Sequence, residues 1–212
     1  MASPAVRGTR ERILEVAEAS LGERGYHGTR LHQIADQVGI QKASLFHYFA
    51  SKEDIYRAVI DAGFGETEQT VRRALEIEGA PEEKIQALVD AYIDIVAAHP
   101  ERTKILLRQS LGDSPVADDK RPDLRRLLDL IVSFVADGQR TRVFAPVDPL
   151  ALVLSIIGMV AFFFTSAPVI APEWFDGVTR EACVERIKRH TAIVVRRCLT
   201  GGGLPRGIAV SG

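Results

Sequence analysis

Four successive residues in the first quarter of the chain carry side chains that suit the edges of DNA bases. They are Gln41, Lys42, Ala43 and Ser44. In the major groove, lysine can donate to guanine and glutamine can pair with adenine, while the methyl group of alanine can contact the methyl group of thymine. These four residues are therefore the candidate readers of a DNA sequence.

Two short helices joined by a tight turn are predicted to position these side chains, within residues 29–52. Apolar residues recur there at steps of three and four, which is the period of one buried helical face; they are Leu31, Ile34, Ala35 and Val38. Thr29 is the expected N-cap of this first helix. Gly39 is expected to end it, because glycine adopts positive φ angles without steric strain.

The second helix is predicted to start near Ile40, and its segment from Gln41 to Phe49 is the one expected to enter a major groove. Its candidate inward residues are Ala43, Leu45, Phe46 and Phe49. Leu45 would anchor this helix to the first one. The remaining positions would then face outward, with the N-terminal end of the helix meeting base edges.

This stretch resembles the DNA-binding region of TetR-family transcriptional regulators. The matching residues are Thr29, Ile34-Ala35, Gly39-Ile40, Leu45-Phe46-His47-Tyr48-Phe49 and Ser51-Lys52. Phe46 departs from the family pattern, which usually has tyrosine there, so a phosphate contact by that hydroxyl is absent. The resemblance implies phosphate contacts by Thr29, His47, Tyr48 and Lys52, which would fix register without reading sequence.

The rest of the chain is also predicted to be helical, so the fold class is all-α. A helix from Arg10 to about Arg24, stopped by Gly25, completes a three-helix DNA-binding unit. Further helices are expected over residues 52–76, 81–98, 101–111, 124–136, 149–166 and 178–199, with a loop over 112–122. The predicted domains are a helix-turn-helix DNA-binding domain over 1–52, a larger helical ligand-binding and dimerisation domain over 53–200, and a disordered tail over 201–212.

The charge and cysteine content place few restrictions on the predicted class of protein. The formal net charge is −1, and residues 1–52 hold seven Lys/Arg and five Asp/Glu. This mild excess of positive charge agrees with a nucleic-acid partner without demonstrating one. Cys183 and Cys198 are too few for a disulfide scaffold. The first residues contain no apolar segment of a secretory signal, so a cytoplasmic location is predicted.

Residues 150–170 form an uncharged stretch long enough to span a bilayer. Gly158 and Pro168 interrupt it, and no Lys/Arg cluster flanks it. Helices that are apolar all round also occur in protein cores and subunit interfaces. Because TetR-family regulators dimerise through their last two long helices, the resemblance favours a homodimer interface over 149–166 and 178–199 and no membrane partner.

Metal binding and catalysis find little support in the sequence. The five histidines form no pair at a spacing of four residues and no short cluster with cysteine, so neither a metal nor a cofactor is predicted. The chain has no glycine-rich phosphate loop and no nucleophile elbow. It is therefore not expected to be an enzyme.

Aromatic residues beyond residue 52 either pack in a core or line a ligand cavity between helices. The candidate cavity residues are Phe64, Tyr92, His99, Phe134, Phe162 and Phe163. We therefore expect a homodimeric repressor that a largely apolar small molecule releases from a palindromic operator. The alternative is a DNA-binding dimer without a small-molecule effector, which a partner protein or its own abundance would regulate.

Overall fold

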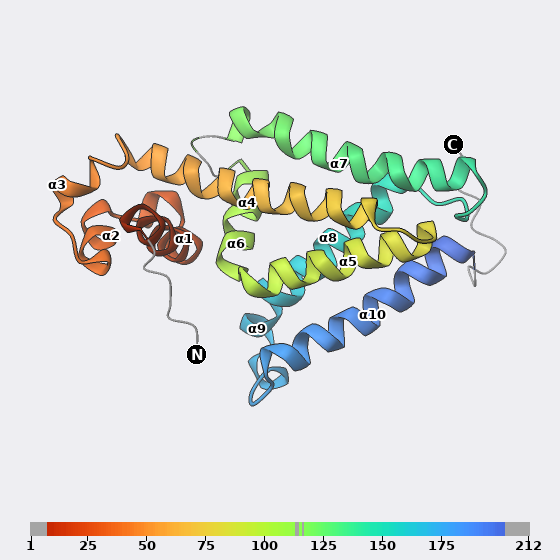
Figure 1. Ribbon diagram of the computed structural model, residues 1–212. Helices are drawn as coiled ribbons and strands as arrows, with labels where there is room; N and C mark the ends of the chain where they lie inside the picture. Colours follow the sequence, from red (N-terminus) through yellow and green to blue (C-terminus); the bar gives the residue numbers. More distant parts are fainter. Residues whose placement is uncertain (1–7, 113–114, 116, 202–212) are drawn as a thin grey trace, which may run out of the picture. The chain divides into compact units, whose positions relative to one another are not determined.

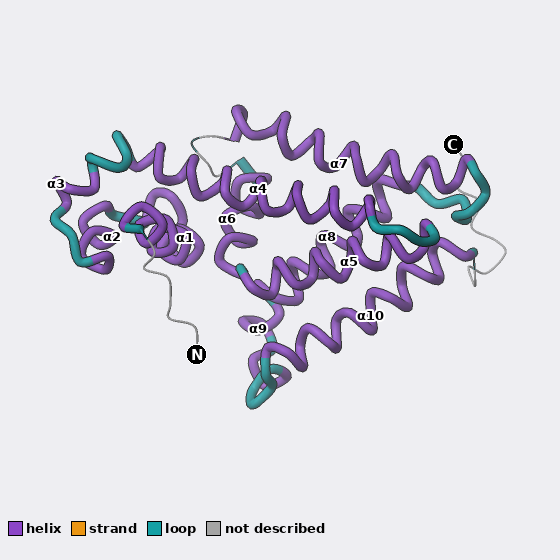
Figure 2. Tube along the Cα trace, in the orientation of Figure 1, coloured by secondary structure: helices purple, strands orange, loops and turns teal. Residues whose placement is uncertain are grey.

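The structure, a computed structural model, describes residues 8–112, 115 and 117–201. Within these residues the chain folds into helices joined by turns and loops, and no β-strand is present (Figures 1 and 2). This confirms the all-α prediction. The chain divides into two compact units: the first contains the residues up to Glu66 and from His99 to Asp123, and the second contains Thr67–Ala98 and the residues from Leu124 onward.

The first unit is built on one hydrophobic core. Its elements are α1 (Thr9–Gly28), α2 (Leu31–Val38), α3 (Lys42–Leu45), the first part of α4 (Lys52–Glu76) and α6 (Pro100–Ser110). The buried core residues are Ile13, Ala17, Leu21, Ile34, Ala35, Val38, Leu45, Phe49, Ile55, Tyr56, Val59, Ile60 and Ile105. Because Ile105 belongs to this core, α6 is part of the same compact unit as the predicted helix-turn-helix.

Several local predictions for the first unit need correction. The N-cap of α2 is Arg30 and not Thr29. Regular helix in α3 ends at Leu45 and turns follow, whereas a helix to Phe49 was predicted. Ala43 and Phe46 are exposed, although both were predicted to face inward. A single helical turn has room for only one inward anchor, which is Leu45.

The second unit has a separate core. It contains the end of α4, α5 (Pro81–Ala98), most of α7 (Ala117–Arg140), α8 (Pro149–Thr165), α9 (Ala167–Ile170), the 3₁₀ helix η1 (Pro172–Trp174) and α10 (Arg180–Thr200). The buried core residues are Val71, Ala74, Ile85, Leu88, Val89, Ile93, Val96, Val135, Phe144, Ile156, Val160, Ile187, Val195 and Leu199. Helix α10 packs against both α5 and α8.

Helices α4 and α5 have their predicted boundaries because the start signals are local, and α8 begins at Pro149, as the family resemblance implies. Ser51 Oγ accepts a hydrogen bond of 3.0 Å from the Asp54 N–H at the start of α4, as the capping pattern predicts. Pro81 is the first residue of α5, a position where its missing N–H would have no intrahelical partner. The side chain of Asp148 accepts from the Ala151 N–H at 3.0 Å and so caps α8.

The start of α7 was predicted wrongly. Residues 112–122 were expected to form a loop, but α7 begins at Ala117. A polar helix turn shows no apolar periodicity, so its sequence resembles that of a loop. The short elements α9 and η1 were not predicted either. Residues 202–212 of the predicted tail lie outside the described residues.

Both cysteines lie in α10 and are free thiols. No helix among the described residues has the length and apolar character needed to cross a bilayer.

Candidate nucleic-acid interface

The turn between α2 and α3 has the geometry that the sequence predicts. Gly39 adopts a φ of 81° at the end of α2. Its N–H and that of Ile40 each donate to the carbonyl oxygen of Ala35 at 3.0 Å. This arrangement satisfies carbonyl groups that the end of a helix leaves free. The chain then reverses into α3, where Leu45 is fully buried.

The four predicted base readers lie together on the outer side of α3. Gln41, Lys42 and Ala43 are exposed, and Ser44 is half-buried. Gln41 stands at the N-cap, so the four residues occupy the N-terminal end of this short helix. Leu45, which follows them, is buried in the core of the first unit and anchors α3 there. Gln41, Lys42 and Ala43 are therefore accessible to a partner on the surface.

The turn that follows α3 exposes more of the predicted DNA contacts. His47 and Tyr48 are exposed. Phe46 is 46% exposed beside them, and sequence reasoning missed this because its apolar character suggested the core. The Phe46 ring lies next in sequence to His47, between the predicted base readers and the predicted phosphate contacts. Phe46 therefore joins the candidate interface.

Two cations are held at this end of the first unit by aromatic rings. The Lys52 ammonium lies 4.4 Å from the centre of the Tyr26 ring, and partial burial lowers the pKa of Lys52 below its ordinary value. The Arg10 guanidinium lies 5.1 Å from the centre of the Phe49 ring. Such contacts orient a cation without neutralising its charge. Sequence reasoning missed Arg10, because no local pattern links α1 to Phe49.

The structure corrects the predicted role of Thr29. This residue is 2% exposed, and its hydroxyl faces two backbone carbonyls, Ser20 O at 3.0 Å and Gly25 O at 2.8 Å. Its N–H also donates to Gly25 and Tyr26. A hydroxyl has only one proton to donate, so Thr29 has none to offer a phosphate. Its role is to fasten the segment before α2 to the end of α1.

The six predicted ligand-binding residues are divided between the two units. Phe64 packs against the first core, and His99 faces the carboxylates of two glutamates in the same unit. Tyr92, Phe134 and Phe163 pack against the second core. Phe162 is 55% exposed on α8, so in the single chain it lines no enclosed space.

Tyr92 and Phe134 are held within the second unit by specific contacts. The Tyr92 hydroxyl donates to Ile157 O at 3.4 Å, and burial raises the pKa of Tyr92. The Phe134 ring meets the Phe144 ring edge to face at 6.2 Å. Both residues thus have the packing of core side chains, and Tyr92 has a polar partner as well.

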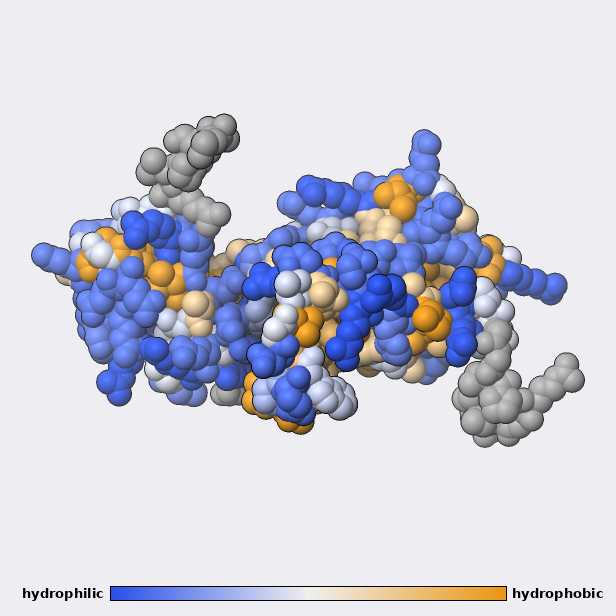
Figure 3. All heavy atoms as spheres, turned by 90° about the horizontal axis from the view of Figure 1, so that it is seen from below, coloured by the Kyte–Doolittle hydropathy of each residue, from blue (hydrophilic) through white to orange (hydrophobic). Residues whose placement is uncertain are grey.

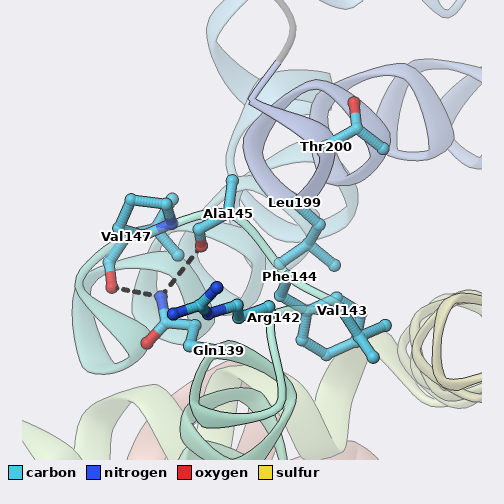
Figure 4. Close-up of a pocket in the computed structure, with 9 residues that line it drawn as sticks. Gln139, Arg142, Val143, Phe144, Ala145, Val147, Leu199 and Thr200 are labelled. Carbon is cyan, nitrogen blue, oxygen red and sulfur yellow. Dashed lines mark hydrogen bonds between the residues drawn. The ribbon is translucent and has the colours of Figure 1, made fainter.

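A pocket of about 570 Å³ opens in the second unit, between the loop after α7 and the end of α10 (Figure 4). Its lining residues are Gln139, Arg142, Val143, Phe144, Ala145, Pro146, Val147, Leu199 and Thr200. The Gln139 side chain holds the loop by donating to Ala145 O at 3.1 Å and Val147 O at 2.7 Å. None of the six predicted ligand-binding residues lines this pocket.

The pocket has the features of a helix terminus rather than those of a ligand-binding site. Arg142 has a φ of 62°, and the Val143 N–H donates back to Gly138 O at 2.8 Å. Arg142 thus occupies the left-handed position that ends α7, where glycine is usual. The C-termini of α7 and α10 both reach the lining, and the negative end of a helix dipole disfavours an anion. We assign no ligand to this pocket.

An apolar stripe runs along the outside of α8. Leu150, Leu154, Gly158 and Phe162 follow at steps of four residues, and all four are exposed. Ile193 on α10 is exposed as well. In the space-filling view, apolar side chains interrupt an otherwise hydrophilic surface in several places (Figure 3). A regular exposed stripe of this kind is typical of a surface that another chain covers.

Metal-binding geometry does not appear in the described part of the chain. No three His, Cys, Asp or Glu side chains gather there in a way that could hold an ion.

Two family profiles match the chain. The profile described as "Bacterial regulatory proteins, tetR family" matches residues 13–59. The profile described as "Tetracyclin repressor-like, C-terminal domain" matches residues 81–195. The first match covers α2, α3, most of α1 and the start of α4, and the second runs from the start of α5 into α10.

Individual proteins resemble the chain over most of its length. The HTH-type transcriptional regulator RutR of Escherichia coli (strain K12) is 28% identical over 209 residues, which are 96% of this chain and 94% of RutR. The crystal structure of the TetR-family regulator PfmR from Thermus thermophilus has a TM-score of 0.73 and 25% identity, covering 95% of this chain and 100% of PfmR.

The structure of AibR with isovaleryl coenzyme A and operator DNA has a TM-score of 0.67. It is 22% identical and covers 85% of this chain and 96% of AibR. At that identity the likeness concerns the fold alone.

Proposed function

Because this chain belongs to the TetR family of bacterial regulatory proteins, we propose that it is a homodimeric transcriptional repressor. It binds a palindromic operator, and a largely apolar small molecule releases it. The observation that carries this proposal is the exposure of Gln41, Lys42, Ala43 and Ser44 on the anchored helix α3. The DNA partner implies that the protein acts in the cytoplasm.

The proposed contacts with DNA fall into two groups. Gln41, Lys42, Ala43 and Ser44 read base edges in the major groove. His47, Tyr48 and Lys52 contact phosphates and set the register. Lys52 suits this second role because the Tyr26 ring orients its ammonium without neutralising it.

The homodimer is proposed from the apolar stripe on α8. Leu154 and Phe162 are about half-exposed in the single chain, and a second copy would cover them. A two-fold dimer presents two equivalent recognition helices, so its operator should be a palindrome. The two half-sites would be about 34–36 Å apart, which is one turn of DNA.

The small-molecule effector is proposed from the composition of the second unit and from the fold. Its core is apolar and aromatic, with Tyr92, Phe134 and Phe163 packed against it. AibR shows that a protein of this fold holds both isovaleryl coenzyme A and operator DNA. Helix α4 begins at the proposed phosphate contact Lys52 and continues into the second unit. It therefore connects the DNA-binding unit covalently to the second unit.

The alternative is a DNA-binding dimer that responds to a partner protein or to its own abundance. Calorimetry with candidate ligands separates the two hypotheses. Effector and operator must weaken each other equally, and a coupling of about 1–3 kcal/mol is typical. Equal ligand affinities with and without operator would show that a bound molecule is not the effector.

Selection of bound sequences from random DNA tests the proposal as a whole. The purified protein should enrich a two-fold symmetric site. Enriched sites without two-fold symmetry would contradict the proposed docking, and failure to enrich any sequence would contradict sequence-specific binding.

A further inference from the structure

An arginine on α6 joins three helices of the first unit. Nε and Nη2 of Arg102 lie 2.9 and 2.8 Å from the same oxygen, Oε2 of Glu18 on α1. Nη1 of Arg102 donates to Glu66 Oε2 on α4. His99 lies across the same carboxylates, with Nδ1 3.5 Å from Glu18 Oε1 and Nε2 3.9 Å from Glu66 Oε1. We refer to Glu18, Glu66, His99 and Arg102 as the Arg102 cluster.

Arg102 and Glu18 are shielded from water within the cluster, whereas the Glu66 side chain is 44% exposed. The Arg102 side chain is only 12% exposed. A Cβ atom on Gly63 of α4 would lie 2.6 Å from Arg102 Cδ, so the absence of a side chain at residue 63 gives the arginine its path. Ionic hydrogen bonds with limited access to water are stronger and more directional than exposed ion pairs. The Arg102 cluster can therefore fix the orientation of the helices that carry it as well as hold them together.

Polar contacts account for much of the joint between α6 and α1. Helix α6 contributes Ile105 to the core, but Leu107 is 36% exposed. The Arg108 guanidinium donates to Leu21 O near the end of α1 at 3.3 Å. Apolar packing itself has no directed bonds. Arg102 and Arg108 thus add directed bonds to the packing between α1 and α6.

The position of the cluster along the chain is also informative. The chain leaves the first unit after Glu66 and re-enters it at His99. Both residues are members of the Arg102 cluster. A displacement along α4 therefore reaches the first unit at Glu66, which Arg102 binds, and a displacement along α5 reaches it at His99, which faces the same carboxylates.

We propose that Arg102 is a positioning residue for DNA recognition. Its bonds to Glu18 and Glu66 hold α1, α4 and α6 in the arrangement in which α3 is presented correctly to an operator. This inference rests on the proposed DNA-binding function. Arg102 itself contacts no DNA in this account, because it acts through the helices that it joins.

The first test compares operator DNA with random DNA. Arg102→Met removes the charge but keeps the apolar stem, and Arg102→Lys keeps the charge. Arg125→Met is the matched control, because Arg125 pairs with Asp129 on α7 in an exposed ion pair. The affinity of Arg102→Met for the selected operator should fall roughly tenfold, while its affinity for random DNA stays unchanged. Arg102→Lys should recover part of the loss, and Arg125→Met should behave like the native protein.

A merely stabilising role predicts a different result. Arg102→Met would then have a lower melting temperature, and its affinities for operator and random DNA would both be multiplied by the same factor, the fraction of protein that remains folded. That outcome overturns the proposal. Glu66→Gln is the milder second variant, because it removes one carboxylate charge without changing shape. If Arg102→Met folds poorly, Glu66→Gln tests the proposal in its place. Its affinity for the operator should also fall.

The second test needs no DNA and so separates this inference from the proposed function. Spin labels at Ala19→Cys on α1 and Ala62→Cys on α4, in a Cys183→Ala, Cys198→Ser background diluted with unlabelled protein, report the distance between the two helices. Arg102→Met should broaden that distance distribution. An unchanged distribution overturns the positioning role, whatever DNA the protein binds. Failure of the native protein to select any DNA, with a broadened distribution, would contradict the proposed function alone.

Discussion

Gly22 of α1 and Glu101 of α6 approach so closely that a Cβ atom on residue 22 would lie 2.8 Å from the Glu101 Cα atom. The Glu101 Cα is a backbone atom, so it cannot move aside by a change of side-chain rotamer. The lack of a side chain at Gly22 is therefore a condition for α6 to lie against α1 at this angle.

Gly22→Ala should accordingly destabilise the protein by about 1–3 kcal/mol, as overpacking generally does. Gly65→Ala is the matched control, because Gly65 is also helical and an added Cβ there meets nothing within 4 Å. That control should gain about 0.5–1 kcal/mol from the higher helix propensity of alanine. Urea denaturation would measure both, and equal effects of the two substitutions would refute the close-approach explanation.

Arg142 offers a test in which a substitution should raise the stability of the protein. It holds a φ of 62° at the end of α7, a conformation that disfavours residues with a Cβ atom. Arg142→Gly should therefore stabilise the protein by about 0.5–1 kcal/mol, even after the entropy that glycine loses on folding. The melting temperature should rise by roughly 2–4 °C per kcal/mol for a chain of this size.

Arg142→Ala is the control for the loss of the charged side chain. It keeps the Cβ atom and hence the strain, so it should show no gain in stability. If alanine stabilised the protein as much as glycine, removal of the arginine side chain, and not relief of backbone strain, would be the cause.

The proposed dimer interface predicts a distinct effect of a buried charge. Leu154 lies in the exposed stripe of α8 and is 49% exposed in the single chain. Leu154→Lys would bury an unpaired charge in each subunit, which should weaken the dimer by about 3 kcal/mol or more. Leu124→Lys on α7 is the control, because Leu124 is similarly exposed but lies outside the stripe.

Sedimentation at micromolar concentration would measure the result. The native protein and Leu124→Lys should sediment as dimers, and Leu154→Lys should sediment as a monomer. A native protein that is monomeric at this concentration would rule out the proposed homodimer.

Local signals account for the parts of the fold that were predictable from sequence. The starts of α4 and α5 follow from Ser51 and Pro81, each of which acts within one helical turn. Gly39 likewise marks the turn before α3. Such signals need no knowledge of the rest of the chain, which is why the helix-turn-helix could be located in advance.

The features that sequence reasoning missed depend on contacts between distant residues. Thr29 matches a family position, but its hydroxyl is bonded to Ser20 O in the preceding helix. Arg102 meets Glu18 and Glu66 only after folding, and no spacing rule connects them. Periodicity reports which face of a helix is buried and gives no information about its partner.

In the proposed complex, α3 reads the DNA sequence while Lys52 contacts a phosphate. The most direct measurement selects binding sites from random DNA with the native protein, Lys42→Ala and Lys52→Ala, and follows the salt dependence of each affinity. Lys52→Ala should keep the native site, weaken binding to all sequences alike, and reduce the salt slope by about one. Lys42→Ala should instead change the preferred base at one symmetric pair of positions in the palindrome. An unchanged preference in Lys42→Ala, or an altered preference in Lys52→Ala, would contradict this account.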